Sequence, residues 1–293
     1  MNFKRMILIA VILISAVAIM FLTGCSSPGD SQQESTTQGS TTQEPATQES
    51  TTTQSIMSGL TFAPTTVSSN GTGTDGGYFY TFWIDRVSGN ASMTMDGANG
   101  YTTTCSNLTG GFVAGKGWAT GSSNRVINFQ GTYKSSYGGA FGLYGWTKNP
   151  LVEYYVIEHA GDKENPCTSP DIDGQKHTYL GWMFSDDGVY GVWKNYRVNK
   201  PSIVGNSNFW QYISVRGYTY YERDSGPITF QNHVNEWAKY GLNLGSHDYQ
   251  ILFTEMWSPQ DNNGNAIRGQ YVSGNSNGTI VSPSNRRRRP KRY

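Results

Sequence analysis

The chain has few cysteines and few charged residues, and these two shortages limit the classes of protein it can belong to. Three cysteines among 293 residues are too few for a domain held together by disulfides. Charged residues make up only 15% of the chain, and its formal net charge is +1. Six basic residues lie within the last eight positions, so the remainder is mildly acidic and nucleic acid is not an expected partner. The four histidines lack metal-ligand spacing, so we expect neither a metal nor a cofactor.

Glycine and aromatic residues are abundant instead. The chain holds 35 Gly, 19 Tyr, 12 Phe and 8 Trp, a composition that favours a strand-rich protein over a helical one. Short alternating segments are separated by Gly, Asn and Asp, which is typical of an all-β antiparallel sandwich. We expect strands at Tyr78–Trp83, Arg125–Phe129, Val152–Ile157, Phe209–Val215, Tyr249–Glu255 and Gly278–Val281.

One segment has helical periodicity. The pattern predicts a single helix from Phe230 to about Tyr240, packed on the sandwich. Thr229 is the expected N-cap. Val234, Trp237, Ala238 and Gly241 are expected on its buried face.

The first 24 residues read as an export signal. Lys4 and Arg5 precede an apolar run, and the sequence Leu22-Thr-Gly-Cys25 is similar to the lipobox of bacterial lipoproteins. That similarity implies a signal peptide at residues 1–24 and lipidation of Cys25. An ordinary cleaved signal and an uncleaved anchor helix are the alternatives. All three export the protein, either as a membrane-anchored lipoprotein or to the extracellular space.

The rest of the chain divides by composition. Residues 25–58 are a Ser/Thr/Gln-rich tract that cannot bury enough apolar surface to fold, and we expect a disordered linker. Residues 59–283 form the expected globular domain. Residues 284–293 form a basic tail, which could bind an anionic polymer, lack a function or be a sequence artefact. Cys105 and Cys167 could pair in an oxidising compartment or stay as two thiols.

Two glutamates lie in strand-like, aromatic-rich segments. Alternation along a strand places Glu153 on one face with Tyr155, and Glu255 on one face with Tyr249. Cleavage of a glycosidic bond needs two carboxyl groups, one protonated and one ionised, and aromatic faces can stack on sugar rings. This pattern indicates a glycosidase. Two other glutamates, Glu158 and Glu222, are expected on solvated faces.

Seven segments follow one another along the chain: Gly115–Trp118, Val126–Phe129, Tyr144–Trp146, Asn149–Tyr155, Arg197–Ile203, Phe209–Arg216 and Tyr249–Glu255. In this order they resemble the family 11 glycoside hydrolases, which are endo-1,4-β-xylanases. The resemblance implies that residues 59–283 are a catalytic domain with a β-jelly-roll sandwich of two antiparallel sheets. It also implies endo-acting hydrolysis of internal β-1,4-xylosidic bonds with retention.

The resemblance also implies a role for each matching residue. Glu153 corresponds to the nucleophile and Glu255 to the acid/base, with their carboxyl groups ~5–5.5 Å apart in a retaining enzyme. A negative Glu153 raises the pKa of Glu255. The implied substrate-binding residues are Trp83, Tyr144, Tyr155, Arg197, Pro201 at the tip of a mobile thumb, Gln211 and Tyr249.

Four departures from the family pattern affect this site. Gly111 stands where an Asn or Asp usually contacts the acid/base, and Asn107 is a candidate substitute. Phe253 takes a cleft-facing position that is usually small. Met256 and Trp257 follow Glu255, where the family usually has Gly and an aromatic residue, and residues 258–268 resemble an insertion.

A non-catalytic carbohydrate-binding sandwich and a β-1,4-glucanase remain as alternative functions. The expected partners are xylan or xylo-oligosaccharides and, through the lipid, a membrane; the protein is expected to be a monomer.

Overall fold

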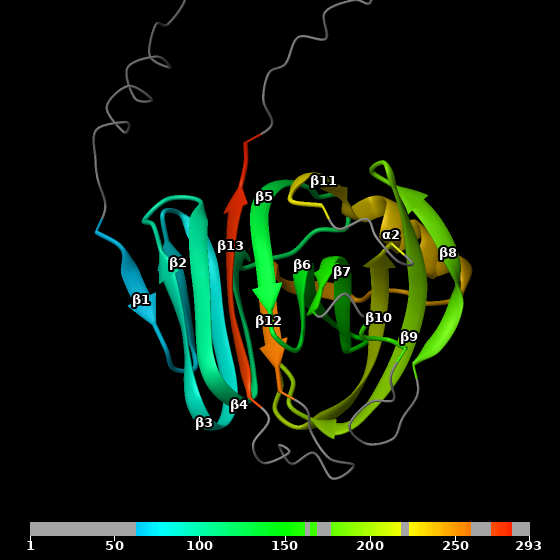
Figure 1. The fold of residues 1–293 in the computed structure, drawn as a ribbon. Helices are drawn as coiled ribbons and strands as arrows, with labels where there is room; N and C mark the ends of the chain where they lie inside the picture. The colour runs from blue at the N-terminus through cyan, green and yellow to red at the C-terminus, as the bar shows by residue number, and fades with distance from the viewer. Residues whose placement is uncertain (1–62, 162–164, 169–176, 218–222, 259–270, 283–293) are drawn as a thin grey trace, which may run out of the picture. The chain divides into compact units, whose positions relative to one another are not determined.

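Thirteen strands and one helix form the part of the chain that the structure, a computed structural model, describes (Figure 1). That part comprises residues 63–161, 165–168, 177–217, 223–258 and 271–282. The strands are β1 (Thr65–Val67), β2 (Gly71–Asp75), β3 (Tyr78–Met95), β4 (Gly100–Trp118), β5 (Val126–Ser135), β6 (Gly138–Lys148), β7 (Val152–Ala160), β8 (Thr178–Ser185), β9 (Gly188–Lys200), β10 (Ser207–Arg216), β11 (Ser225–Thr229), β12 (Ser246–Trp257) and β13 (Val272–Ile280). The helix is α2 (Phe230–Lys239). All six predicted strand segments lie within or overlap strands of the structure, and the all-β prediction with a single helix is confirmed for the described residues.

The long strand β4 joins the layers of the fold. Its first half pairs with β13 and its second half with β12, while β3 runs along its other side. The main strand order is therefore β11-β5-β13-β4-β12-β6-β7-β10-β9-β8, in one hydrogen-bonded network. Among the described strands the pairing is antiparallel except between β7 and β10, which run parallel.

Glycine is needed where β4 approaches β12. A Cβ atom on Gly115 would lie 2.0 Å from the carbonyl oxygen of Leu252, and one on Gly117 would lie 2.2 Å from that of Gln250. Between these glycines, the Lys116 ammonium is fully buried and lies 2.6 Å from an Asp75 carboxylate oxygen. The motif Gly115–Trp118 thus combines close strand contact with a buried ion pair.

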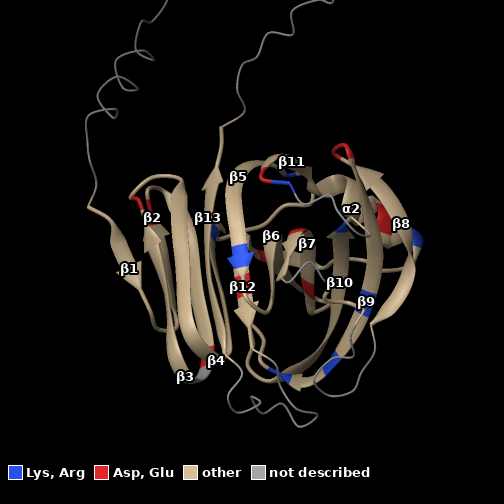
Figure 2. Ribbon diagram, viewed as in Figure 1, with Lys and Arg blue, Asp and Glu red and all other residues tan. Residues whose placement is uncertain are grey.

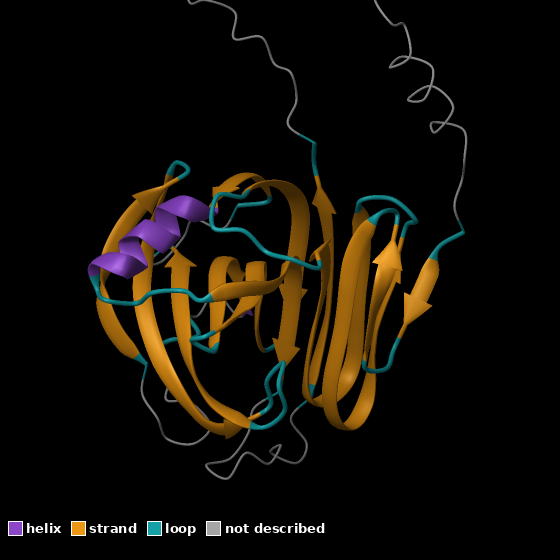
Figure 3. Ribbon diagram, turned by 180° about the vertical axis from the view of Figure 1, so that it is seen from behind, coloured by secondary structure: helices purple, strands orange, loops and turns teal. Residues whose placement is uncertain are grey.

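Helix α2 packs on one face of the sheet, and Figure 3 shows it lying across the strands. Its buried residues are Phe230, His233 and Trp237. Of the predicted face, Trp237 is buried, but Ala238 and Gly241 are exposed, so this prediction is wrong for those two residues.

Thr229 is the N-cap by position but makes no side-chain capping bond to the helix. Its backbone N–H and hydroxyl instead donate to the carboxylate of Asp186, at 2.7 and 2.6 Å. Asp186, in the turn after β8, therefore holds Thr229 at the start of the helix.

Two apolar clusters occupy opposite faces of the strands, because alternate side chains of a strand point to opposite sides. The larger, here the main core, includes Tyr154, Tyr212 and the α2 residue Trp237. The smaller, here the second cluster, includes Tyr155 and Phe253. Burying one such aromatic side chain stabilises the fold by about 1.5–3 kcal/mol.

Several predictions from the sequence lie outside the described residues. They are the signal peptide at 1–24, the lipidation of Cys25, the linker at 25–58, Glu222, the insertion after Ser258 and the basic tail at 284–293. Within the described part, no helix has the length and apolar character needed to cross a membrane. Cys105 and Cys167 are both buried and are not joined to each other as a disulfide.

Candidate active site

The two predicted catalytic glutamates lie on the same face of the sheet. Glu153 is on β7 and Glu255 on β12, and β6 runs between these two strands. Their neighbours at two-residue spacing, Tyr155 and Phe253, both belong to the second cluster. Both carboxyl groups therefore lie on the second-cluster side of the sheet.

Two chains of hydrogen bonds converge on Glu153, which is 8% exposed. Trp146 Nε1 donates to the Tyr144 hydroxyl over 2.6 Å, and this hydroxyl donates to Glu153 Oε1 over 2.6 Å. From the other side, Asn195 Nδ2 donates to Gln211 Oε1 over 3.0 Å, and Gln211 Nε2 donates to Glu153 Oε2 over 2.7 Å. Each carboxylate oxygen therefore has its own fixed donor.

The two carboxyl groups differ in electrostatic environment. Burial raises the pKa of Glu153, but hydrogen bonds from Tyr144, Gln211 and Tyr155 and the charge of Arg197 oppose that rise. Burial is also the largest cause that raises the pKa of Glu255 to about 8, and the negative charge of Glu153 is the second. The expected coupling is present, with desolvation as the larger effect. Glu153 is thus the group better stabilised as an anion, and Glu255 the better proton carrier.

Tyrosine and phenylalanine rings surround these carboxyl groups. The Tyr144 ring centroid lies 4.9 Å from that of Tyr155 and 5.4 Å from that of Phe253. The Tyr155 hydroxyl lowers the pKa of both glutamates, so it acts on both carboxyl groups. Tyr249 packs against Tyr144 at 6.0 Å. Phe253 is fully buried beneath these rings, as expected for a residue that fills the floor of the site.

The remaining predicted binding residues lie on two other strands and in a turn. Trp83 is on β3 and 38% exposed, which leaves part of its ring open for contact. Arg197 is on β9, close enough to act electrostatically on both Glu153 and Glu255. Pro201 lies in the tight turn between β9 and β10, which is closed by hydrogen bonds between Ser202 and Gly205.

Gly111 is a diagonal neighbour of Glu255 across the β4–β12 pair. Glu255 pairs with Val113 and Trp257 pairs with Gly111. Diagonal neighbours of this kind lie within reach of long side chains. Asn107 lies four residues further along β4, about 13 Å away at strand spacing. Its position does not support the idea that it replaces the missing Asn or Asp.

Sequence reasoning missed two residues that hold the site together. Trp146 and Asn195 act on Glu153 through Tyr144 and Gln211. Each lies two positions from a predicted site residue, Tyr144 or Arg197, on the same strand. The alternation that placed the glutamates could therefore have identified both.

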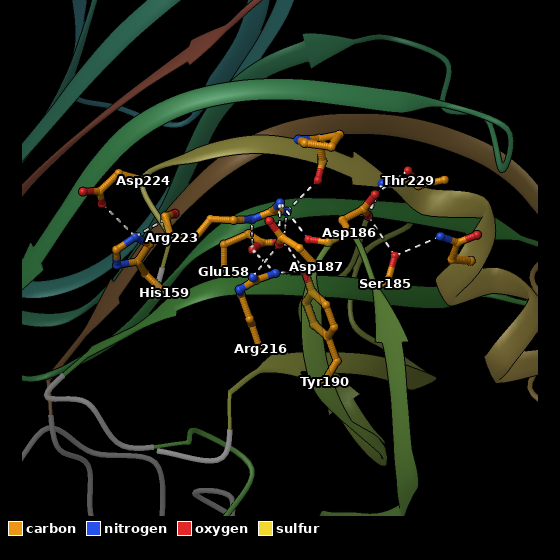
Figure 4. Close-up of polar contacts among 12 residues, drawn as sticks. Glu158, His159, Ser185, Asp186, Asp187, Tyr190, Arg216, Arg223, Asp224 and Thr229 are labelled. Atoms are coloured by element: carbon orange, nitrogen blue, oxygen red, sulfur yellow. Dashed lines mark hydrogen bonds and ion pairs between the residues drawn. The ribbon is translucent and has the colours of Figure 1, made fainter. Parts of the chain in front are cut away.

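The prediction that Glu158 lies on a solvated face is wrong, since it is 1% exposed. Arg223 contacts its carboxylate at 2.9 and 3.1 Å, and the Tyr190 hydroxyl donates to it at 2.9 Å (Figure 4). Arg216 adds an ion-pair contact at 3.7 Å. Alternation explains the burial, because Glu158 shares its face with Tyr154, a main-core residue. We call Glu158, Tyr190, Arg216 and Arg223 the arginine cluster.

Charged residues are sparse along the strands, as Figure 2 shows. Among the described residues, no group of three or more His, Cys, Asp or Glu side chains could hold a metal ion. His233 lies on the buried face of α2, and burial lowers its pKa to about 3. His247 instead contacts the Ser123 hydroxyl at 2.9 Å.

A family model and two relatives of known function point to the same family. Residues 75–267 match the model of the glycosyl hydrolases family 11. The chain is 47% identical over 193 residues to a bifunctional xylanase/xylan deacetylase of Cellvibrio japonicus, covering 65% of this chain and 28% of that protein. It is equally identical, over 193 residues, to the endo-1,4-beta-xylanase Xyn11B of the same organism, covering 65% of this chain and 52% of that protein. The chain thus spans about half or less of the length of these two relatives.

A solved structure agrees with this assignment. It comes from a structural comparison of two major endo-1,4-β-xylanases from Trichoderma reesei, with 33% sequence identity and a TM-score of 0.52. The match covers 74% of this chain and 98% of that one. The likeness supports the β-jelly-roll fold that the resemblance implied. The family model covers well over half of the chain, and the chain belongs to the glycosyl hydrolases family 11.

Proposed function

We propose that the protein is an endo-1,4-β-xylanase that hydrolyses internal β-1,4-xylosidic bonds of xylan. The observation that carries the proposal is the pair of glutamates on one sheet face with unequal environments. Glu153 receives two fixed hydrogen-bond donors, whereas the pKa of Glu255 is raised to about 8. A glycosidase needs such a difference between its two carboxyl groups.

In the proposed mechanism, Glu153 attacks the anomeric carbon while Glu255 gives its proton to the leaving oxygen. The bond to the leaving sugar breaks and a covalent glycosyl-enzyme forms. Glu255, now ionised, removes a proton from water as the water attacks the same carbon. That step releases Glu153 as a carboxylate and the sugar with retained configuration. Formation of the intermediate neutralises Glu153, which removes the charge that favours protonation of Glu255.

Substrate-binding roles follow from position. The half-open ring of Trp83 offers a face for stacking on a xylose ring, and Tyr249 lies beside Tyr144 to extend that surface. Tyr155 and Arg197 act close to the reacting groups. Gln211 positions the nucleophile. The turn at Pro201 is proposed to close over the chain as a lid.

Two alternatives are less well supported. A binding module needs aromatic rings but has no use for a carboxyl group whose pKa is raised to about 8. A β-1,4-glucanase must admit a hydroxymethyl group on every sugar, and buried Phe253 fills the floor below Tyr144 and Tyr155. Both observations favour the xylanase.

Export and attachment are part of the proposal. Residues 1–24 would direct export, lipidated Cys25 would hold the protein at a membrane, and residues 25–58 would tether the monomeric catalytic domain away from it. Fractionation of cells that produce the wild type or Cys25→Ala would test this idea. The wild type should remain with membranes and the variant should not. Equal distribution of the two would contradict lipidation.

The activity is tested by measuring reducing ends released from xylan and from a soluble β-1,4-glucan. Wild type should act on xylan, Glu153→Gln and Glu255→Gln should lose nearly all of that activity, and Asp224→Asn, an exposed carboxylate, should keep it. Proton NMR of the first products should show the β-anomer, as retention requires. Release from glucan alone would assign the glucanase, and binding without release would assign the binding module.

A further inference from the structure

A tyrosine from a strand that does not pair with β12 contacts the backbone of Glu255. β5 lies against β12, although the two strands are not neighbours in the strand order (Figure 1). From β5, the Tyr133 hydroxyl donates to the main-chain carbonyl oxygen of Glu255 over 3.0 Å. The Tyr133 ring packs against the main core, whereas the Glu255 carboxyl group lies on the second-cluster side. The contact therefore reaches Glu255 from behind the sheet face that carries the site.

Glycine at position 139 leaves the space for this contact. A Cβ atom on Gly139 would lie 2.0 Å from the Tyr133 hydroxyl oxygen and 2.3 Å from the Glu255 carbonyl oxygen. The φ angle of Gly139, +150°, also lies in a region that residues with a side chain rarely adopt. On β6, Gly139 stands opposite Met256, the residue that follows Glu255. The backbone of β6 and the hydroxyl of Tyr133 thus meet at one carbonyl oxygen.

A neighbouring ring restrains Tyr133. His159 lies next to it, with the two ring centroids 6.4 Å apart. The Nε2 atom of His159 donates to the backbone carbonyl oxygen of Arg223 over 3.0 Å (Figure 4). Arg223 belongs to the arginine cluster and contacts the buried carboxylate of Glu158 at 2.9 Å. The Tyr133 hydroxyl is therefore presented to Glu255 by a ring that packs against a fixed neighbour.

The two glutamates of the site are fixed at different atoms. The carboxylate oxygens of Glu153 accept hydrogen bonds from Tyr144 and Gln211, whereas Tyr133 donates to the main-chain oxygen of Glu255. In the proposed mechanism, the Glu255 carboxyl group first gives a proton to the leaving oxygen and then takes one from water. A restraint on the backbone keeps Glu255 in place and leaves its carboxyl group able to change partners.

Glu255 lies two residues before the end of β12 at Trp257, and the ends of an element open more readily than its centre. We propose that Tyr133 is a positioning residue for the acid/base, which holds the Glu255 backbone so that the carboxyl group meets the leaving oxygen. The assignment rests on the proposed function, because it takes Glu255 as the acid. A displacement of about 1 Å at a catalytic group lowers the rate by up to about a hundredfold.

The test compares two substrates that differ in how much acid assistance they need. Phenyl β-xylobioside has a basic leaving oxygen that needs a proton, whereas dinitrophenyl β-xylobioside releases a stable anion without one. The ratio kcat/KM covers the steps up to the glycosyl-enzyme and excludes the later step in which Glu255 acts as a base. Tyr133→Phe removes only the hydroxyl. We expect its kcat/KM to fall about tenfold on the phenyl substrate and less than about twofold on the dinitrophenyl substrate.

Two further variants calibrate the result. Glu255→Gln removes the acid itself and should show the same selectivity at full size, with a loss of about a hundredfold or more on the phenyl substrate. Tyr101→Phe is the matched control, because it removes a buried hydroxyl that contacts the Thr254 hydroxyl of the same strand at 3.2 Å. It should keep the wild-type kcat/KM on both substrates. Circular dichroism checks that each variant is folded.

Equal losses on the two substrates in Tyr133→Phe, or no loss on either, would overturn the proposal. So would the same selective loss in Tyr101→Phe, which would assign the effect to a general loosening of β12. Failure of the proposed function has a different signature, in which the wild type cleaves neither xylobioside or Glu255→Gln loses both substrates alike. A selective loss in Glu255→Gln without one in Tyr133→Phe would overturn only the role of Tyr133.

Discussion

Gln211 and Glu153 stand directly opposite each other across the parallel β7–β10 pair, and the Gln211 amide donates to the Glu153 carboxylate over 2.7 Å. Strand register fixes the backbone position of Gln211, and the hydrogen bond from Asn195 Nδ2 to Gln211 Oε1 orients its amide. This hydrogen bond stabilises the ionised form of a nearly buried carboxylate.

Replacing Gln211 with Leu is expected to move the acid limb of kcat/KM to higher pH. The amide donor lowers the pKa of Glu153, so its loss raises that pKa and protonates the nucleophile at a higher pH. We expect a shift of about 0.5–1 unit. Asn195→Ala, which frees the Gln211 amide without removing it, should shift the limb in the same direction by less. An unchanged acid limb in Gln211→Leu would show that Gln211 does not tune the nucleophile.

The basic limb of activity should lie near the pKa of Glu255, which burial and the charge of Glu153 raise to about 8. Because Glu255 must carry a proton to act as an acid, kcat/KM should fall as the pH rises through this value. The profile is measured with a soluble xylo-oligosaccharide. A basic limb at pH 5 to 6 would contradict this assignment.

The same raised pKa affects stability with a defined sign. The folded protein binds a proton at Glu255 more tightly than the unfolded chain does, so stability from this group is lost as the pH rises from about 4.5 towards 8. Glu255→Gln removes this pH-dependent loss of folding stability. The substitution should raise the free energy of unfolding at pH 8 by about 1–2 kcal/mol, with little effect at pH 4. Urea unfolding at both pH values checks the difference. An equal gain at both would point to packing and not to titration.

Gly111→Asn should lower the pKa of Glu255 and move the basic limb to lower pH. The nearest atoms to an added Cβ lie at 3.4 Å, an ordinary contact, so the side chain can be accommodated. As a diagonal neighbour of Glu255, its amide can donate to the ionised carboxylate. We expect a shift of about 0.5–1 unit. Gly111→Ala adds the Cβ without the donor and should leave the pH profile unchanged.

Strand alternation was enough to predict which side chains of one strand share a face with each glutamate. It placed Glu153 with Tyr155 and Glu255 with Tyr249, because period two depends only on local backbone geometry. It could not predict that β7 and β10, more than 50 residues apart in sequence, run side by side in parallel. The donor from Gln211 depends on that pairing, so its hydrogen bond to Glu153 could not be derived from local pattern alone.

The errors have equally specific causes. Glu158 was assigned to solvent by the general preference of glutamate, although its alternation partner Tyr154 is a core residue. The hydrogen bonds that Thr229, at the start of α2, donates to Asp186 depend on a turn more than 40 residues earlier in the chain. Local rules identify the ends of elements, but the partners that satisfy their polar groups come from the tertiary fold.

Glu158→Gln should strongly destabilise the protein, because Glu158 is the buried partner of Arg223 and Arg216 in the arginine cluster. Neutralising it leaves two mostly buried guanidinium groups without their shared carboxylate, and we expect a loss of about 3–5 kcal/mol. Asp187→Asn is the matched control. Asp187 contacts Arg216 at 2.8 Å but its side chain is 79% exposed, so water replaces the contact and the loss should be about 1 kcal/mol or less. Urea midpoints of both variants measure the difference. Similar midpoints would mean that the arginines find other partners, and that the carboxylate at position 158 does not hold β7, β9 and β10 together.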